Sequence, residues 1–97
     1  MEAMLANEKQ IIQRAQTGDR AALATIYREH YTAIFNYLFY RLGDQATAED
    51  LTAEVFVRMV DKIESYRYRG KPILAWLYTI ARNLLINHQQ RADNAPR

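Results

Sequence analysis

The positions of glycine and proline limit the fold of this chain more than any other feature of its sequence. Only three glycines and two prolines occur among the 97 residues. They lie at the boundaries of segments in which apolar residues recur every three or four positions, and the apolar–polar alternation of a half-buried strand is absent. Residues at that spacing share one face of a helix. The sequence therefore predicts an all-α fold, a compact bundle of about four helices.

The four expected helices span about residues 7–16, 20–42, 46–66 and 72–91. Asp19 is typical of an N-cap, Gly43 of a helix C-terminus, and Pro72 of a first helical turn. We expect the core stripes of the last three helices to be Leu23, Ile26, Tyr27, Tyr31, Ile34, Leu38 and Leu42, then Leu51, Thr52, Val55, Phe56, Met59 and Ile63, then Ile73, Leu77, Ile80, Ala81 and Leu84.

Charge divides the chain into two parts of opposite sign, although its formal net charge is only +2. Residues 43–64 carry six carboxylates against two cations, whereas residues 65–92 carry no carboxylate, five cations and four large aromatic side chains. The first part suits a basic partner, and the second suits a polyanion such as nucleic acid.

Two helix faces are candidates for these partners. Asp50, Glu54, Val57 and Asp61 share the outer face of the third expected helix, although the pattern by itself favours an ordinary solvated surface. On the fourth, Trp76 is followed along one flank by Asn83, Asn87 and Gln90, while Thr79, Arg82 and Ile86 point away. Core packing of Trp76 and a structural role of Asn83 are the competing interpretations.

Composition argues against several classes of protein. There are no cysteines, the N-terminus lacks the pattern of a signal peptide, and the longest mostly apolar stretch, residues 73–81, is about half of the ~20 residues that span a membrane. The glycines form no phosphate-binding loop, Ser65 lacks a nucleophile-elbow context, and His30 and His88 lie on separate helices without a second ligand. We expect a cytoplasmic protein that is not an enzyme, with no catalytic residue, cofactor or metal.

Two separated motifs resemble those of a known family. Residues 48–58 read AEDLTAEVFVR, and residues 68–72 and 75–83 read YRGKP and AWLYTIARN. Together they closely resemble bacterial RNA polymerase sigma factors of the extracytoplasmic-function type, over roughly residues 19–91. Ala53 and Asn87 depart from the family pattern, which commonly has glutamine and often aspartate at these positions.

The resemblance implies a region 2 domain over residues 1–91, with residues 92–97 as the start of a linker to a helix-turn-helix domain outside this chain. It implies docking on the β′ clamp helices of core RNA polymerase and recognition and melting of the minus-ten promoter element through its non-template strand. The docking residues implied are Asp50, Glu54, Val57, Arg58 and Asp61. An anti-sigma factor is a further implied partner, and a helical module held by such an inhibitor, without DNA binding of its own, is the alternative.

The residues expected to hold DNA combine cations, aromatic rings and amides. Aromatic stacking contributes ~1–3 kcal/mol per unpaired base, and Tyr68 and Trp76 are the stacking candidates. Cations neutralise phosphates whatever the base sequence. The expected set is Arg67, Tyr68, Arg69, Lys71, Trp76, Arg82, Asn83, Asn87, Gln90 and Arg91.

Overall fold

Four α-helices and one short 3-10 helix make up the fold. The structure is a computed structural model that describes residues 2–94, and the side chains of residues 7–93. The helices are Glu2–Gln16 (α1), Arg20–Leu42 (α2), Gln45–Lys62 (α3) and Ile73–Asn94 (α4), with a 3-10 helix (η1) over Ile63–Ser65. No strand occurs within the described residues, and the predicted all-α class is confirmed.

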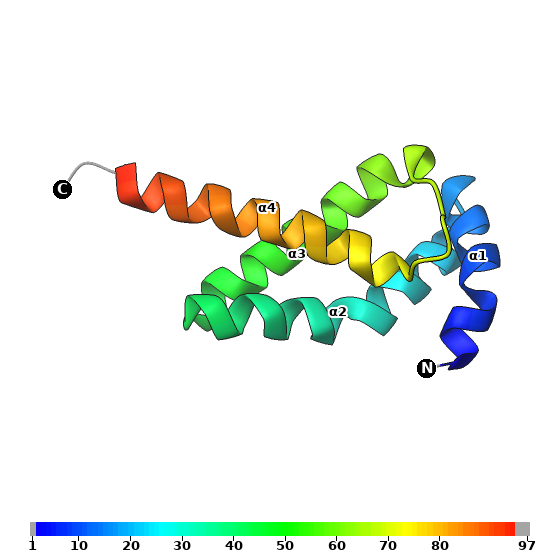
Figure 1. Ribbon diagram of the computed structural model, residues 1–97, viewed down its shortest axis with the longest axis horizontal. Coiled ribbons are helices and arrows are strands. Elements are labelled where there is room, and N and C mark those ends of the chain that lie inside the picture. Colours follow the sequence, from blue (N-terminus) through cyan, green and yellow to red (C-terminus); the bar gives the residue numbers. More distant parts are fainter. Residues whose placement is uncertain (1, 95–97) are drawn as a thin grey trace.

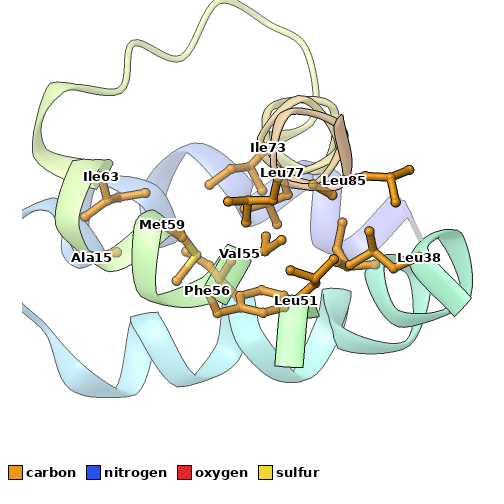
Figure 2. Close-up of a cluster of buried hydrophobic side chains, with 14 of the residues drawn as sticks. Ala15, Leu38, Leu51, Val55, Phe56, Met59, Ile63, Ile73, Leu77 and Leu85 are labelled. Carbon is orange, nitrogen blue, oxygen red and sulfur yellow. The ribbon is translucent and has the colours of Figure 1, made fainter. Parts of the chain in front are cut away.

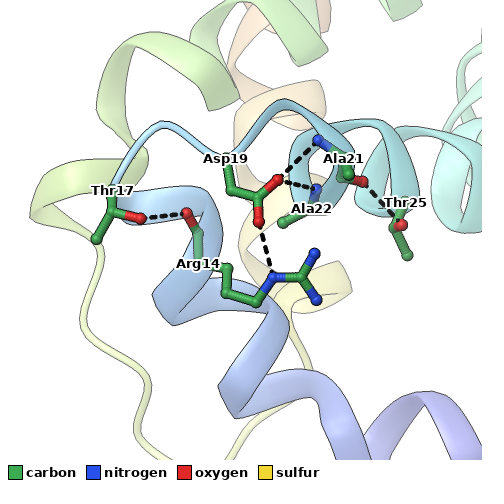
Figure 3. A network of polar contacts seen from close by, with 6 residues as sticks. All are labelled: Arg14, Thr17, Asp19, Ala21, Ala22 and Thr25. Atoms are coloured by element: carbon green, nitrogen blue, oxygen red, sulfur yellow. Dashed lines mark hydrogen bonds and ion pairs between the residues drawn. The ribbon is translucent and has the colours of Figure 1, made fainter.

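A network of polar contacts fixes the corner between α1 and α2 (Figure 3). Asp19 is the N-cap of α2, as expected, and its Oδ1 accepts hydrogen bonds from the backbone N–H of Ala21 and Ala22 at 2.9 and 3.3 Å. Its Oδ2 pairs with Nε of Arg14 at 2.8 Å. The hydrogen bonds from the Arg14 side chain and from these backbone groups lower the pKa of Asp19. The corner therefore depends on one carboxylate that serves both helices.

A two-residue turn joins α2 to α3 and makes them antiparallel neighbours (Figure 1). Gly43 ends α2 at a φ of 72°, a left-handed conformation that glycine adopts without steric cost, and its N–H donates to the Phe39 carbonyl at 2.8 Å. Asp44 then caps α3 by accepting from the backbone N–H of Thr47 at 2.8 Å. Because both caps are adjacent in sequence, α3 starts directly where α2 stops.

The core lies where α2, α3 and α4 meet, and α1 packs across the N-terminal end of α2 (Figure 1). Figure 2 shows side chains of α4, such as Leu77, meeting those of α3, such as Val55. The expected stripe of α3 is buried in full, and four of the five residues expected from α4 are buried as well. The buried apolar residues are Ile12, Ala15, Ala22, Ile26, Ile34, Leu38, Ala48, Leu51, Val55, Phe56, Met59, Ile63, Ile73, Leu77, Ala81, Leu84 and Leu85.

Some expected core positions lie at the rim instead. Tyr27 is 44% exposed, and its ring contacts Phe56 edge-on, with centroids 5.0 Å apart. A tyrosine at the rim keeps its ring on apolar neighbours while its hydroxyl stays close to water. Ile80 is only partly buried, whereas Leu85, which was not among the expected core residues, is buried. Helical periodicity thus predicted the faces correctly but not how deeply each position is buried.

The helix boundaries differ from expectation by a few residues. α1 begins at Glu2 rather than near residue 7, and α3 ends at Lys62, where η1 tightens the last turn before Tyr66. α4 begins at Ile73, directly after Pro72, and continues to Asn94. Residues 92–94, expected to start a linker, are therefore helical, whereas residues 95–97 lie outside the described residues. No helix of the described part is long and apolar enough to cross a membrane.

His30 is a buried titratable group in α2. Its side chain is 8% exposed, and Nε2 has no hydrogen-bond partner among the described residues. Burial lowers the pKa of His30 because the charged imidazolium is poorly solvated there, and the charges of Glu8 and Glu29 oppose this shift only in part. The folded chain therefore resists protonation of this histidine.

We expect Leu77→Ala to lower the free energy of unfolding by ~2–5 kcal/mol, because it removes a fully buried aliphatic side chain from the contact between α4 and α3. Urea unfolding followed by circular dichroism measures the change. Gln89→Ala, at an exposed position of the same helix, is the matched control and should stay within about 0.5 kcal/mol of the parent. Equal stability of the two variants would show that the α4 face is assigned wrongly.

The lowered pKa of His30 predicts a pH dependence of stability. An unfolded histidine titrates at about pH 6.5, so below that pH the unfolded chain binds a proton that the folded chain resists. The free energy of unfolding should therefore fall between pH 7.5 and 5.5, and His30→Gln should reduce that slope. Gln13→Ala, at an exposed position without a titratable group, is the control and should keep the parent slope. Parallel pH profiles for the parent and His30→Gln would contradict the prediction.

Candidate functional site

The segment between η1 and α4, residues 66–72, carries three exposed cations and is called here the basic loop. Arg67, Arg69 and Lys71 line an open hollow of about 250 Å³ together with Trp76 and Thr79 from the first turns of α4. Each of the three is exposed, and neither ion pair found within the described part of the chain includes them. The basic loop therefore presents its charge to a ligand rather than to a carboxylate of the fold.

Trp76 is held by Tyr66 and borders two hollows. The two rings stack with centroids 4.5 Å apart and an interplanar angle of 28°. Burial raises the pKa of the Tyr66 hydroxyl, in keeping with its packing between the loop and α4. Trp76 is partly buried against the core, so the structural interpretation holds for part of the ring, but it also lines the hollow of the basic loop and the next hollow along α4.

Two further hollows continue along the seam between α3 and α4. The first, about 240 Å³, shares Trp76 and Thr79 with the hollow of the basic loop. The second, about 410 Å³, shares Arg58, Leu84 and Asn87 with the first. We call the three adjoining hollows the α4 trough. Glu54, which is paired with Arg58 at 3.3 Å, is the only carboxylate among its lining residues, so the charge of the trough is mostly positive.

The α4 trough brings together most of the residues expected to hold DNA. Asn83 is exposed, which does not fit the alternative of a structural role, and Asn87 is exposed as well. The expected residues that line it are Arg67, Arg69, Lys71, Trp76, Asn83, Asn87, Gln90 and Arg91.

Two expected residues lie outside the trough. Tyr68 is partly buried and packs against the core, so its ring is committed to the fold. Arg82 is exposed but lines none of the three hollows, since it lies six residues after Trp76 and therefore about 120° around the helix. Their roles in binding remain predictions that the geometry of the trough does not favour.

The outer edge of α3 separates the α4 trough from a further hollow, which is apolar. We call Asp50, Glu54, Val57 and Asp61 the α3 ridge, and three of them are exposed, while Glu54 is partly buried. On the side facing α2, a hollow of about 380 Å³ is lined by Tyr27, Ala53, Phe56, Val57, Val60 and Asp61.

Large apolar side chains are unusually exposed along this apolar hollow. Tyr27, Val57 and Val60 are 44%, 58% and 49% exposed, which is a contiguous apolar surface beside carboxylates rather than a scatter of single residues. Val57 was expected on this surface, whereas Tyr27 was expected in the core and Val60 in neither place. The exposure of Val60 could have been predicted from the sequence, because Val60 lies three residues after Val57 and off the core stripe of α3.

Lys62 and Arg58 add positive charge to the trough from the helix that is otherwise acidic. Both line the 240 Å³ hollow that Trp76 also lines. Arg58 was expected only at the polymerase surface, and Lys62 was expected neither there nor at the DNA surface. Within the described residues, no group of three or more histidine, aspartate or glutamate side chains is placed to hold a metal ion. The cations, the indole of Trp76 and the amides that line the trough suit it to binding through charge, stacking and hydrogen bonds.

Comparisons with known proteins agree with this architecture. The sequence matches the sigma-70 region 2 family over residues 26–95. It is 42% identical over 79 residues to the ECF RNA polymerase sigma factor BldN of Streptomyces coelicolor, which covers 81% of this chain and 30% of BldN. It is 39% identical over 72 residues to the RNA polymerase sigma factor YlaC of Bacillus subtilis, which covers 74% of this chain and 41% of YlaC.

A solved structure shares the fold as well as the sequence. A chain of the RsbN–BldN complex superposes with a TM-score of 0.74 at 41% identity, covering 84% of this chain and 59% of that chain. The chain thus spans less than half the length of the two sigma factors named above. From the family match, the sequence identity and the shared fold, the chain belongs to the sigma-70 region 2 family, as a region 2 domain of the ECF sigma factor type.

Proposed function

We propose that this domain docks on the β′ clamp helices of RNA polymerase through the α3 ridge and captures the non-template strand of the minus-ten promoter element in the α4 trough. The observation that carries the proposal is the position of two surfaces of opposite character on the two sides of α3. One is acidic and apolar, and the other is basic and amide-rich. The names of the relatives, which are RNA polymerase sigma factors, support the assignment.

Docking through α3 follows from the composition of the ridge and the apolar hollow beside it. Exposed carboxylates steer a basic partner and set its orientation, whereas apolar side chains supply the buried area. Val57 and Asp61 belong to both features, because they lie on the ridge and line the apolar hollow. A basic helical partner with apolar side chains at helical spacing would place its charges on Asp50 and Asp61 and its apolar face on Val57.

Strand capture follows from the chemistry of the trough. Unpaired bases stack on an aromatic ring, and Trp76 is the ring of the expected pair that lines the hollows. Amides such as Asn83 and Asn87 offer both a donor and an acceptor to base edges that are exposed only after melting. Phosphates would lie near Arg69 and Lys71 of the basic loop. These contacts favour single strands and thereby stabilise the melted state.

A second function has one observation in its favour. The relative BldN has been solved in a complex with RsbN. A domain that is held by an inhibitor protein and binds no DNA on its own is therefore the competing proposal. The apolar hollow and the partly exposed Ile86 would serve such a partner as well as a polymerase. Competition between the inhibitor and the clamp helices for the same surface would reconcile the two proposals.

We expect Asp50→Arg combined with Glu54→Arg to abolish binding to an isolated β′ clamp-helix fragment, because it reverses the charge of the ridge. Titration calorimetry measures the affinity, and circular dichroism should show unchanged helix content, since exposed carboxylates contribute little to stability. Glu29→Arg with Glu64→Arg makes the same charge change at exposed positions outside the ridge and should bind like the parent. Equal affinity of both double variants would refute docking through α3.

Binding of a labelled minus-ten oligonucleotide tests the trough. We expect weak binding by this chain alone, with the non-template single strand bound more tightly than the same sequence as a duplex, because stacking and base-edge contacts require unpaired bases. Fluorescence anisotropy at several salt concentrations measures both affinities. Arg69→Ala should weaken both complexes and reduce the salt slope for single strands by about 0.7, the value for one phosphate contact.

Two further variants distinguish specific contacts in the trough from general electrostatic attraction. Asn87→Ala should lower the affinity for the single strand, whereas Gln89→Ala, two residues away and outside the hollows, should leave it unchanged. Equal affinity for duplex and single strand at every salt concentration would reject strand capture and leave only a basic surface.

A further inference from the structure

Helix α1 contacts both ends of the basic loop, although it lies far from it in sequence. Nε2 of Gln16 donates hydrogen bonds to the carbonyls of Ile63 and Tyr66, at 3.0 and 2.7 Å, where the chain leaves η1. The carboxylate of Glu8 accepts a hydrogen bond from the backbone N–H of Ile73, where the chain enters α4. Figure 1 shows the loop, in yellow-green to yellow, passing beside α1.

The contacts satisfy the Ile73 N–H and the Tyr66 carbonyl, and they add a second donor to the Ile63 carbonyl, which also accepts from the N–H of Tyr66. The first N–H groups of a helix have no acceptor inside it, and a carboxylate at a helix N-terminus is favoured by the helix dipole. Glu8 is only 1% exposed, and a carboxylate is buried at such low exposure only when it is hydrogen-bonded. Gln16 serves two carbonyls with one amide group. The polar groups of both side chains are therefore bonded to the backbone at the ends of the loop.

The basic loop has few backbone hydrogen bonds of its own. Between η1 and α4 of the described chain, the backbone hydrogen bonds outside regular helices are Tyr66 N–H to Ile63 at 3.1 Å and Ala75 N–H to Pro72 at 3.0 Å, one at each end. The stretch between these ends carries Arg67, Arg69 and Lys71. Between its ends the loop is also held where Tyr68 packs against the core, and the two ends themselves are held by hydrogen bonds to α1.

We propose that α1 is a positioning element for the basic loop, in which Gln16 and Glu8 fix its two ends and so place the cations and the Tyr66–Trp76 stack at the α4 trough. Gln16 binds the carbonyl of Tyr66, the residue whose ring stacks on Trp76, and so acts on the trough through that residue. The consequence for strand binding rests on the proposed function, but the order of the loop is measurable without any nucleic acid.

Substitution of Gln16 in the full chain tests the proposal. Gln16→Met keeps the size of the side chain but removes its donors, and Gln16→Glu places a carboxylate against two carbonyl oxygens. We expect faster amide hydrogen exchange over residues 66–72 and stronger acrylamide quenching of Trp76, the single tryptophan of the chain, with a larger effect for Glu than for Met. Gln13→Met and Gln13→Glu, at an exposed position of α1, should change neither measurement.

The affinity for the single-stranded minus-ten oligonucleotide should fall by about three- to tenfold in the Gln16 variants, as expected for the loss of one or two hydrogen bonds. Binding to the clamp-helix fragment through the α3 ridge should stay at the parent value, which a general loss of folding would not allow. Glu8→Gln, which keeps an acceptor but removes the charge, should raise the exchange rate of the Ile73 amide.

The outcomes separate this inference from the proposed function. Unchanged exchange and quenching in both Gln16 variants would overturn the positioning role, whatever the chain binds. A loosened loop with unchanged strand affinity would overturn the link between α1 and the trough. No strand binding by the parent chain would overturn the proposed function, while the exchange rates would still decide whether α1 holds the loop.

Discussion

Burial of the apolar stripes of α3 and α4 against each other and against α2 is the constraint on which both candidate surfaces depend. Because successive residues of a helix are about 100° apart, the position of Val55 and Met59 in the core sets where every other residue of α3 points. Asp50 and Val57 are thereby turned outward. On α4, burial of Leu77 has the same effect and turns the flank from Trp76 to Gln90 toward the seam with α3. The helical parts of both surfaces are thus a consequence of the core.

Sequence reasoning succeeded where the information is local and failed where it is distant. Helical period and capping residues such as Asp19 and Gly43 are read within one turn of the chain, and these features are confirmed. The rim position of Tyr27 depends on Phe56, a residue of another helix, and the partial burial of Tyr68 depends on the path of the loop. The contacts of Gln16 and Glu8 join residues 47 to 65 positions apart, and nothing in the local pattern of α1 marks them. The assignment of binding residues stays a prediction, since the geometry groups them without a ligand.

The boundary between the two surfaces is narrow, and one ion pair lies on it. Glu54 belongs to the α3 ridge and Arg58 to the lining of the trough, and the two are joined at 3.3 Å across one turn of α3. A little under half of each side chain is exposed, and a pair of this kind on a helix surface contributes only about 0.3–0.5 kcal/mol. Either side chain can therefore exchange its partner at little cost when a ligand arrives. Ala53, where the family resemblance implies a glutamine, lines the apolar hollow with a short side chain and leaves room for a partner there.

The two-residue turn between α2 and α3 has a consequence for the order in which the molecule assembles. Closing that turn costs little chain entropy, so the α2–α3 hairpin is the natural folding nucleus, and its contacts are of low contact order. The bonds from α1 to the start and end of the basic loop instead require that the whole intervening chain be ordered first. They are expected to form last and to be the first lost in sub-global unfolding. A chain built in this way is expected to keep the α3 ridge in its first-formed unit and the basic loop in its last-formed one.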